Sequence, residues 1–129
     1  MDGLLKDFVN GNQIIAIVNG INGEEKQFFI DKMSELKKII TEMPELYGQD
    51  GKGEEAIAYL HYFNSSFDWY ITEKDITDEQ LQAFGLACMQ CKELGYISIQ
   101  DVITHGGELD LHWTPKTLRE VREQIKARG

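Results

Sequence analysis

Residues 67–73 read Phe-Asp-Trp-Tyr-Ile-Thr-Glu, in which large apolar side chains alternate with other types along the chain. Such alternation is typical of a strand, because successive side chains of a strand point to opposite faces of its sheet. An apolar run at residues 56–63 precedes this stretch, and Asn64-Ser65-Ser66 lies between the two. We therefore predict that residues 56–73 form a β-hairpin.

Short segments of the same kind fill the rest of the second half. The apolar spacing around residues 82–91 also fits a helix, but Gly85 costs about 1 kcal/mol in a helix interior, which favours a strand. The predicted strands are residues 84–89, 95–97 and 108–113. Three helix starts are predicted. Thr77-Asp78-Glu79-Gln80 has the form of a capping box, and Ser98 precedes a short helix at residues 99–104. Thr114 and Pro115 precede the final helix, whose apolar stripe is Leu118, Val121 and Ile125.

The first half is helical by its pattern. Residues 28–43 carry apolar side chains at helical spacing with charged ones opposite, and Pro44 ends the helix. Residues 14–18 fit either a strand or a second short helix, and residues 47–55 are predicted to form a mobile loop. The expected fold class is α+β, with N-terminal helices and a C-terminal helix packed on a mostly antiparallel sheet. Residues 1–129 are expected to form a single domain, helical in 1–43 and strand-rich in 44–129.

The charge of the chain limits its partners. The 129 residues carry a net charge of −9, and residues 42–79 hold ten acidic side chains against two lysines. An acidic surface repels nucleic acid and anionic membranes, and it favours a basic partner. The longest aliphatic run is too short to span a bilayer, and the acidic start does not resemble an export signal. We expect a cytoplasmic protein that contacts neither membrane nor nucleic acid.

Three polar side chains, Glu108, Asp110 and His112, should share one face of the strand predicted at 108–113. Such a row could hold a metal ion or transfer protons, but its members lie about 6.5–7 Å apart along a strand and converge poorly on one ion. A hydrated sheet face is the simpler interpretation. Glu73 should share a face with Trp69, where a carboxylate can act as an acid or serve as an ordinary edge residue.

Two further groups are assigned structural roles. Cys88 and Cys91 have the spacing of half a zinc site, but the other ligands of a closed site are missing, and both thiols are expected to stay reduced. The last helix carries a basic flank interleaved with acids, which favours ion pairs over contact with phosphates. This flank consists of Lys116, Arg119, Arg122 and Lys126. No metal and no cofactor are expected.

Four ordered segments together resemble one known family. They are residues 67–73, Phe84-Gly85-Leu86, Glu93-Leu94-Gly95-Tyr96 and residues 108–113, and the likeness extends over about residues 44–125. The family is domain of unknown function 2958, whose members are carried mainly by plasmids, phages and conjugative elements, often near genes for antirestriction proteins. Leu109 stands where the family usually has arginine.

The resemblance and the charge together imply a non-enzymatic interaction protein of a mobile genetic element. Its sharper form is a counter-defence inhibitor, of antirestriction or anti-CRISPR type, whose acidic surface binds a basic surface of a host or element protein. The candidate binding residues are Glu54, Glu55, Trp69, Glu73, Asp75, Asp78, Glu79, Glu108, Asp110 and His112. The alternative is a small metal-dependent hydrolase that uses Glu73, Glu108, Asp110 and His112.

Overall fold

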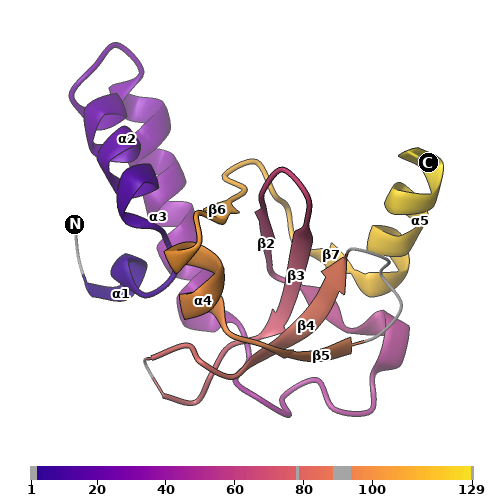
Figure 1. Cartoon of the computed structure of the whole chain (residues 1–129). Coiled ribbons are helices and arrows are strands. Elements are labelled where there is room, and N and C mark those ends of the chain that lie inside the picture. The colour runs from indigo at the N-terminus through magenta and orange to yellow at the C-terminus, as the bar shows by residue number, and fades with distance from the viewer. Residues whose placement is uncertain (1–2, 78, 89–93, 129) are drawn as a thin grey trace.

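A five-stranded antiparallel sheet forms the centre of the molecule in the computed structural model, which describes residues 3–77, 79–88 and 94–128 (Figure 1). Its strand order is β5-β4-β3-β2-β6. The strands are β2 (Leu60–Phe63), β3 (Asp68–Glu73), β4 (Ala83–Cys88), β5 (Leu94–Ile97) and β6 (Glu108–Leu109). A second, two-stranded sheet pairs β1 (Ile57–Ala58) with β7 (Lys116–Thr117).

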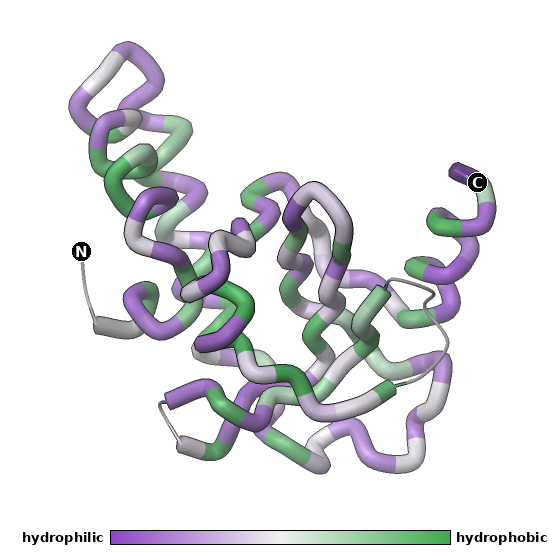
Figure 2. The backbone as a smooth tube through the Cα atoms, viewed as in Figure 1, coloured by the Kyte–Doolittle hydropathy of each residue, from purple (hydrophilic) through white to green (hydrophobic). Residues whose placement is uncertain are grey.

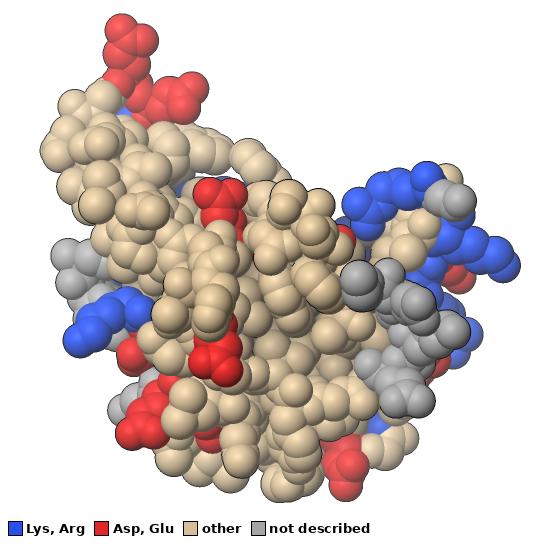
Figure 3. Space-filling model, viewed as in Figure 1, with Lys and Arg blue, Asp and Glu red and all other residues tan. Residues whose placement is uncertain are grey.

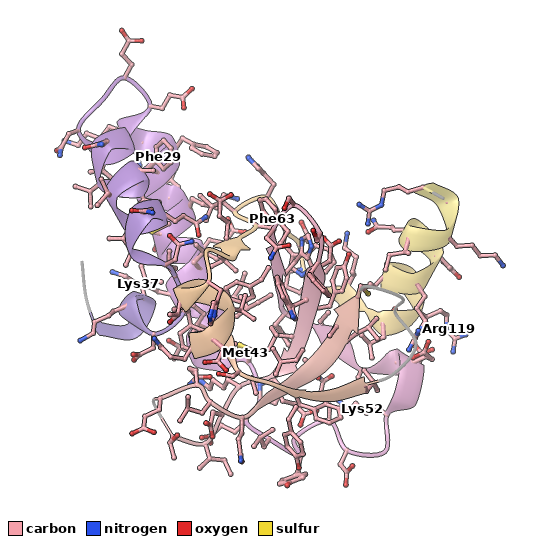
Figure 4. All side chains as sticks on the ribbon, viewed as in Figure 1. Phe29, Lys37, Met43, Lys52, Phe63 and Arg119 are labelled. Atoms are coloured by element: carbon pink, nitrogen blue, oxygen red, sulfur yellow. The ribbon has the colours of Figure 1, made fainter. Side chains whose placement is uncertain are left out.

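Helices cover both faces of the large sheet (Figure 1). They are α1 (Gly3–Lys6), α2 (Gly11–Ile21), α3 (Lys26–Glu42), the 3-10 turn η1 (Gly53–Glu55), α4 (Ile99–Thr104) and α5 (Leu118–Arg128). One hydrophobic cluster joins helices α1 to α4 to one sheet face, and Met43 lies within it (Figure 4). A smaller cluster joins α5 to the other face through Tyr70, Leu86 and Val121. Helices and a mostly antiparallel sheet confirm the predicted α+β class.

The apolar residues that form these clusters are spread along the whole chain. In Figure 2 much of α2 and of the sheet is drawn as hydrophobic. The larger cluster contains Leu5 and Ile17 from the helical first part together with Leu60 and Leu109 from the strand-rich part. None of the described helices is both long enough and apolar enough to cross a bilayer.

Several local predictions are confirmed. The hairpin forms between β2 and β3, with His61 opposite Tyr70, and β4 is a strand as predicted. The open alternative at residues 14–18 is resolved as helix α2, whose first turn is capped by the side chain of Asn10. Helix α4 begins as expected, because Ser98 accepts the backbone N–H of Asp101.

The helical turn predicted to begin at Asp78, which lies outside the described residues, does not extend over residues 79–82. Asp75 uses its carboxylate to accept the backbone N–H groups of Thr77, Leu81 and Gln82. Gln80 has a left-handed backbone with φ of 55°, which a helix does not allow. The carboxylate of Asp75 therefore organises a non-helical turn, and β4 begins at Ala83.

The predicted strand at residues 108–113 is also wrong beyond its first two residues. β6 ends at Leu109, and the Trp113 N–H donates to the Asp110 carbonyl in a tight turn. The final helix starts later than predicted, because Thr117 and Glu120 form the capping box. Lys116 and Thr117 pair with β1 instead of entering the helix.

A bulge in β3 changes the direction of Glu73. The pairing of β3 with β4 shifts between Ile71 and Glu73, so two residues of β3 oppose one residue of β4 there. Strict alternation would put Glu73 on the face of Trp69 and Ile71, which pack against the larger cluster. Glu73 instead lines a cavity together with Thr72. The prediction that Trp69 and Glu73 share a face is therefore wrong.

The close contact of β3 and β4 at Gly85 gives a first prediction. A Cβ atom on Gly85 would lie 2.0 Å from the Tyr70 carbonyl oxygen, so Gly85→Ala should lower the free energy of unfolding by about 3 kcal/mol through overpacking. Gly95 is its partner on β5 and has nothing within 4 Å of that position, so Gly95→Ala is the matched control. Urea unfolding measures both variants. Equal losses of stability would contradict this account of the sheet.

Candidate functional site: a cavity with one buried carboxylate

Residues 46–53 form a series of turns that Gln49 holds in place. The amide of this buried side chain donates to the carbonyl oxygens of Ile57 and Thr72, at 2.9 and 2.8 Å, and accepts the Ile57 N–H at 2.6 Å. The Leu46 N–H donates to the Lys74 carbonyl at 3.0 Å. The glycine-rich composition predicted a mobile loop here, but these hydrogen bonds give the segment a defined conformation against the sheet.

A cavity of about 420 Å³ lies between these turns and the sheet. Its other walls come from Thr72 and Glu73 of β3, Phe84 of β4, Leu94 of β5 and Leu118 at the start of α5. Most of these side chains are apolar, which is typical of a pocket that binds a ligand.

Glu73 is the buried carboxylate among the described residues that line this cavity. The residue is only 6% exposed, and its Oε1 accepts the backbone N–H of Tyr47. Its other oxygen has no hydrogen-bond partner among the described residues. A nearly buried carboxylate with an open oxygen costs free energy unless a donor or cation reaches it.

Tyr47 lines the cavity, and Tyr96 of β5 is hydrogen-bonded to it. Tyr47 has a left-handed backbone with φ of 72°, which is uncommon for a bulky residue and directs its N–H to Glu73. Its hydroxyl lies 2.9 Å from the hydroxyl of Tyr96, whose ring meets Phe84 edge-on at 5.6 Å. The hydrogen bond with Tyr47 raises the pKa of Tyr96, and the Glu73 carboxylate adds to this effect.

A second polar cluster lies on the same sheet face, around His61. Its Nδ1 lies 2.9 Å from Oδ2 of Asp110, and its Nε2 lies 2.7 Å from Oδ1 of Asp68. The imidazole stacks on Tyr70 at 4.6 Å, and Trp113 lies 5.1 Å away. Both ring nitrogens of His61 therefore lie within hydrogen-bond distance of carboxylate oxygens of the fold.

The side chains of this histidine cluster connect separate parts of the fold. Both ring nitrogens are engaged, so neither is open to a substrate or a metal ion. The cluster ties β2 to β3 through Asp68 and to the chain after β6 through Asp110. The hydrogen bond with His61 lowers the pKa of Asp110, against its partial burial, and the backbone N–H of His112 lowers it further. Burial raises the pKa of Tyr70, and Asp68 adds to that.

Several predicted binding residues have internal partners instead. Glu55 lies 2.7 Å from Nη2 of Arg119, a residue of α5 that is labelled in Figure 4. Glu54 makes an ion pair with Arg122, which also belongs to α5. Two of the four residues of the predicted basic flank, Arg119 and Arg122, thus make ion pairs with acids of η1, whereas Lys116 lies in β7 and not in the helix. Asp75 is buried and bonds the turn that follows it. Of the other predicted residues, Glu79 is exposed, Trp69 is half-buried, and Asp78 lies outside the described residues.

The four residues of the predicted hydrolase do not come together. Glu73 is five residues along β3 from Asp68, the partner of the histidine cluster, which is about 16 Å of strand. Asp110 belongs to that cluster, His112 lies against Phe28 at 6.1 Å, and Glu108 borders a hollow near Asn10. The strand that would have aligned them ends at Leu109. In residues 3–77, 79–88 and 94–128 no three His, Cys, Asp or Glu side chains are placed to hold a metal ion.

The cysteines also differ from expectation. Cys88 is buried at the end of β4 and is disulfide-bonded, whereas a reduced thiol was predicted. Cys91 lies outside the described residues.

Charge is distributed unevenly over the surface. Figure 3 shows Lys and Arg gathered over α5, whereas Asp and Glu occur in small separate groups on the face in view. Five of the ten acids in residues 42–79 are engaged by internal partners: Glu54, Glu55, Asp68, Glu73 and Asp75. Internal contacts thus use half of the acidic region that was predicted to face a partner.

The sequence pattern did not identify His61, Gln49 or Tyr47. For His61 a signal was present, because in the hairpin register His61 faces Tyr70 and Asp68 is its diagonal neighbour on the same face. Gln49 and Tyr47 had no such signal, since their partners on β3 are more than 20 residues away in the chain.

The lowered pKa of Asp110 gives a pH-dependent prediction. A carboxyl whose pKa is depressed in the folded state stabilises it above the unfolded pKa of about 3.9 and loses that contribution as pH falls through the folded value. Asp110→Asn should therefore reduce the free energy of unfolding by about 1.5 kcal/mol or more at pH 7 and flatten its decline from about pH 5 to pH 2. Chemical unfolding across that pH range measures this. Asp50→Asn, at an exposed turn, is the control and should follow the unmodified protein; an Asp110→Asn profile that also follows it would refute the role of the cluster.

Comparisons with known proteins add no assignment to this geometry. No family model, curated protein or solved structure matches the chain. The resemblance to the family found on plasmids and phages stays a prediction, and the cavity around Glu73 is the feature from which a function can be argued.

Proposed function

We propose that this chain is a non-enzymatic binding protein that takes a cationic side chain of a partner protein into the Glu73 cavity. The observation that carries the proposal is the state of Glu73, a carboxylate that is 6% exposed, has one oxygen open and lines an otherwise largely apolar cavity. A lysine or arginine side chain has the complementary form, an apolar stem with a cationic end.

The walls of the cavity favour a cation over other ligands. None of the described residues that line it is Lys, Arg or His, and Asp50 adds a second carboxylate. Phe84 and Tyr47 both line the cavity, and the faces of aromatic rings attract ammonium and guanidinium groups. An anionic ligand would meet only negative charge there.

Binding is supported better than catalysis. The hydroxyl of Thr72 donates to the Phe84 carbonyl at 3.1 Å, so this nearby hydroxyl is held in the sheet and is not poised as a nucleophile. Gln49 likewise uses its amide for three backbone contacts. Glu73 is therefore without an evident catalytic partner among the described lining residues, and the hydrolase alternative has no assembled site.

The proposed partner is a host or element protein with a basic surface, met in the cytoplasm. The net charge of −9 would steer a basic partner toward the chain and keep nucleic acid away. The exposed acids Glu42, Glu45, Asp50 and Glu79 would contribute to this field, since they are not engaged by the ion pairs described above. Counter-defence by a mobile element is the biological setting that the family resemblance supplies for this proposal.

The lysine preference of the cavity is open to direct measurement. A pentapeptide Thr-Val-Lys-Val-Thr should bind about tenfold more tightly than the same peptide with norleucine at the centre, because only the ammonium pairs with Glu73. Titrations followed by amide chemical shifts give both affinities. Glu73→Gln should abolish the preference while Asp50→Asn keeps most of it. A lysine preference that survives in Glu73→Gln would sink the proposal.

A further inference from the structure

The walls of the Glu73 cavity offer a ligand few hydrogen-bond acceptors. The backbone carbonyl oxygens of several lining residues already accept hydrogen bonds within the fold: Tyr47, Gln49, Gly53, Ala56, Thr72 and Phe84. The side-chain oxygen of Gln49 accepts the Ile57 N–H, and the Asp50 carboxylate is exposed to water. Among the described lining residues, the open oxygen of Glu73 is therefore the buried side-chain acceptor that has no partner.

Lysine and arginine bring more hydrogen-bond donors than these walls accept. The ammonium group of lysine carries three N–H donors, and the guanidinium group of arginine carries five. Donors that leave water and find no acceptor cost free energy, and Glu73 can accept only part of such a set. Trimethylation of lysine keeps the positive charge and removes all three donors. A trimethylammonium group thus retains the attraction to the Glu73 carboxylate and leaves no N–H group unpaired.

The other walls of the cavity suit methyl groups. Leu46 and Leu94 are apolar lining residues. Phe84 and Tyr47 add two aromatic side chains, and aromatic rings attract quaternary ammonium groups without hydrogen bonds. Tyr96 links these two aromatic walls, because its ring meets that of Phe84 edge-on at 5.6 Å and its hydroxyl lies 2.9 Å from that of Tyr47.

We infer that the ligand of the Glu73 cavity is a quaternary ammonium group, carried by a trimethylated lysine of the partner protein. The inference rests on the proposed function and adds to it the chemical form of the cation. The cavity volume of about 420 Å³ lies near the lower end of the range for ligand pockets, about 300–1,000 Å³, which suits a single side chain.

The test compares four forms of the pentapeptide Thr-Val-Lys-Val-Thr on the unmodified protein. The central residue is lysine, trimethyllysine, norleucine or the neutral carbon isostere of trimethyllysine, in which a tert-butyl group replaces the trimethylammonium group. The trimethyllysine peptide should bind about tenfold more tightly than the lysine peptide, and about tenfold more tightly than the isostere, which has the same shape and no charge. In titrations followed by amide chemical shifts, the Tyr47 signal should move and the Leu109 signal, on the far edge of the sheet, should not.

Two variants and a competitor locate the recognition. Glu73→Gln should reduce the difference between trimethyllysine and its isostere to about twofold, whereas Asp50→Asn, at an exposed turn, should keep most of it. A full difference in Glu73→Gln would contradict the inference. Tetramethylammonium ion that binds as tightly as the trimethyllysine peptide would identify a free quaternary ammonium ion as the ligand and overturn the assignment to a partner side chain.

The peptide series also separates this inference from the proposed function. Lysine that binds as tightly as trimethyllysine, and is still preferred to norleucine, would overturn the inference and leave the proposed function standing. Equal binding of trimethyllysine and its isostere, with lysine no better than norleucine, would overturn both, because charge would then play no part in binding.

Discussion

The candidate site depends on the β-bulge in β3 between Ile71 and Glu73. Without the extra residue, alternation would turn Glu73 toward the larger hydrophobic cluster, where a carboxylate would have no partner. With it, Glu73 faces the opposite side of the sheet and meets the N–H of Tyr47. The same stretch offers the Thr72 carbonyl to Gln49, so the bulge also fixes the turns that wall the cavity. One irregularity in the strand thereby positions both the carboxylate and its surroundings.

The sheet that carries this bulge is anchored on both faces and at one edge. Helices α1 to α4 cover one face, α5 covers part of the other, and Gln13 completes the hydrogen bonds of Leu109 at the β6 edge. The histidine cluster adds a hydrogen-bonded tie between the hairpin and the chain after β6.

Short-range patterns predicted most of the fold but little of the site. The hairpin, helix α3, strand β4 and the Ser98 cap follow from periodicity and capping residues that act within a few positions. Predictions failed where a side chain bonded a distant or unexpected backbone group. Asp75 replaced a helical turn, and Thr117 capped the final helix in place of Thr114. The cavity depends on contacts of Gln49 and Tyr47 with β3, which are distant in the chain. Alternation along a strand does not predict a bulge either. Glu73 was therefore predicted to lie beside Trp69, which is on the other face of the sheet.

The negative charge of residues 42–79 does not form one continuous surface that is available to a partner. A continuous acidic surface would suit an inhibitor that imitates nucleic acid, but half of the acids in residues 42–79 serve arginines, a histidine or backbone N–H groups within the fold. Exposed charges act mainly on the rate of encounter, and their field is screened beyond about 10 Å at 0.1 M salt. Selectivity would then have to come from a group whose pairing is desolvated. Among the acids of this region, Glu73 has that combination of burial, an open oxygen and an adjoining cavity, so long-range attraction and local recognition would be divided between different carboxylates.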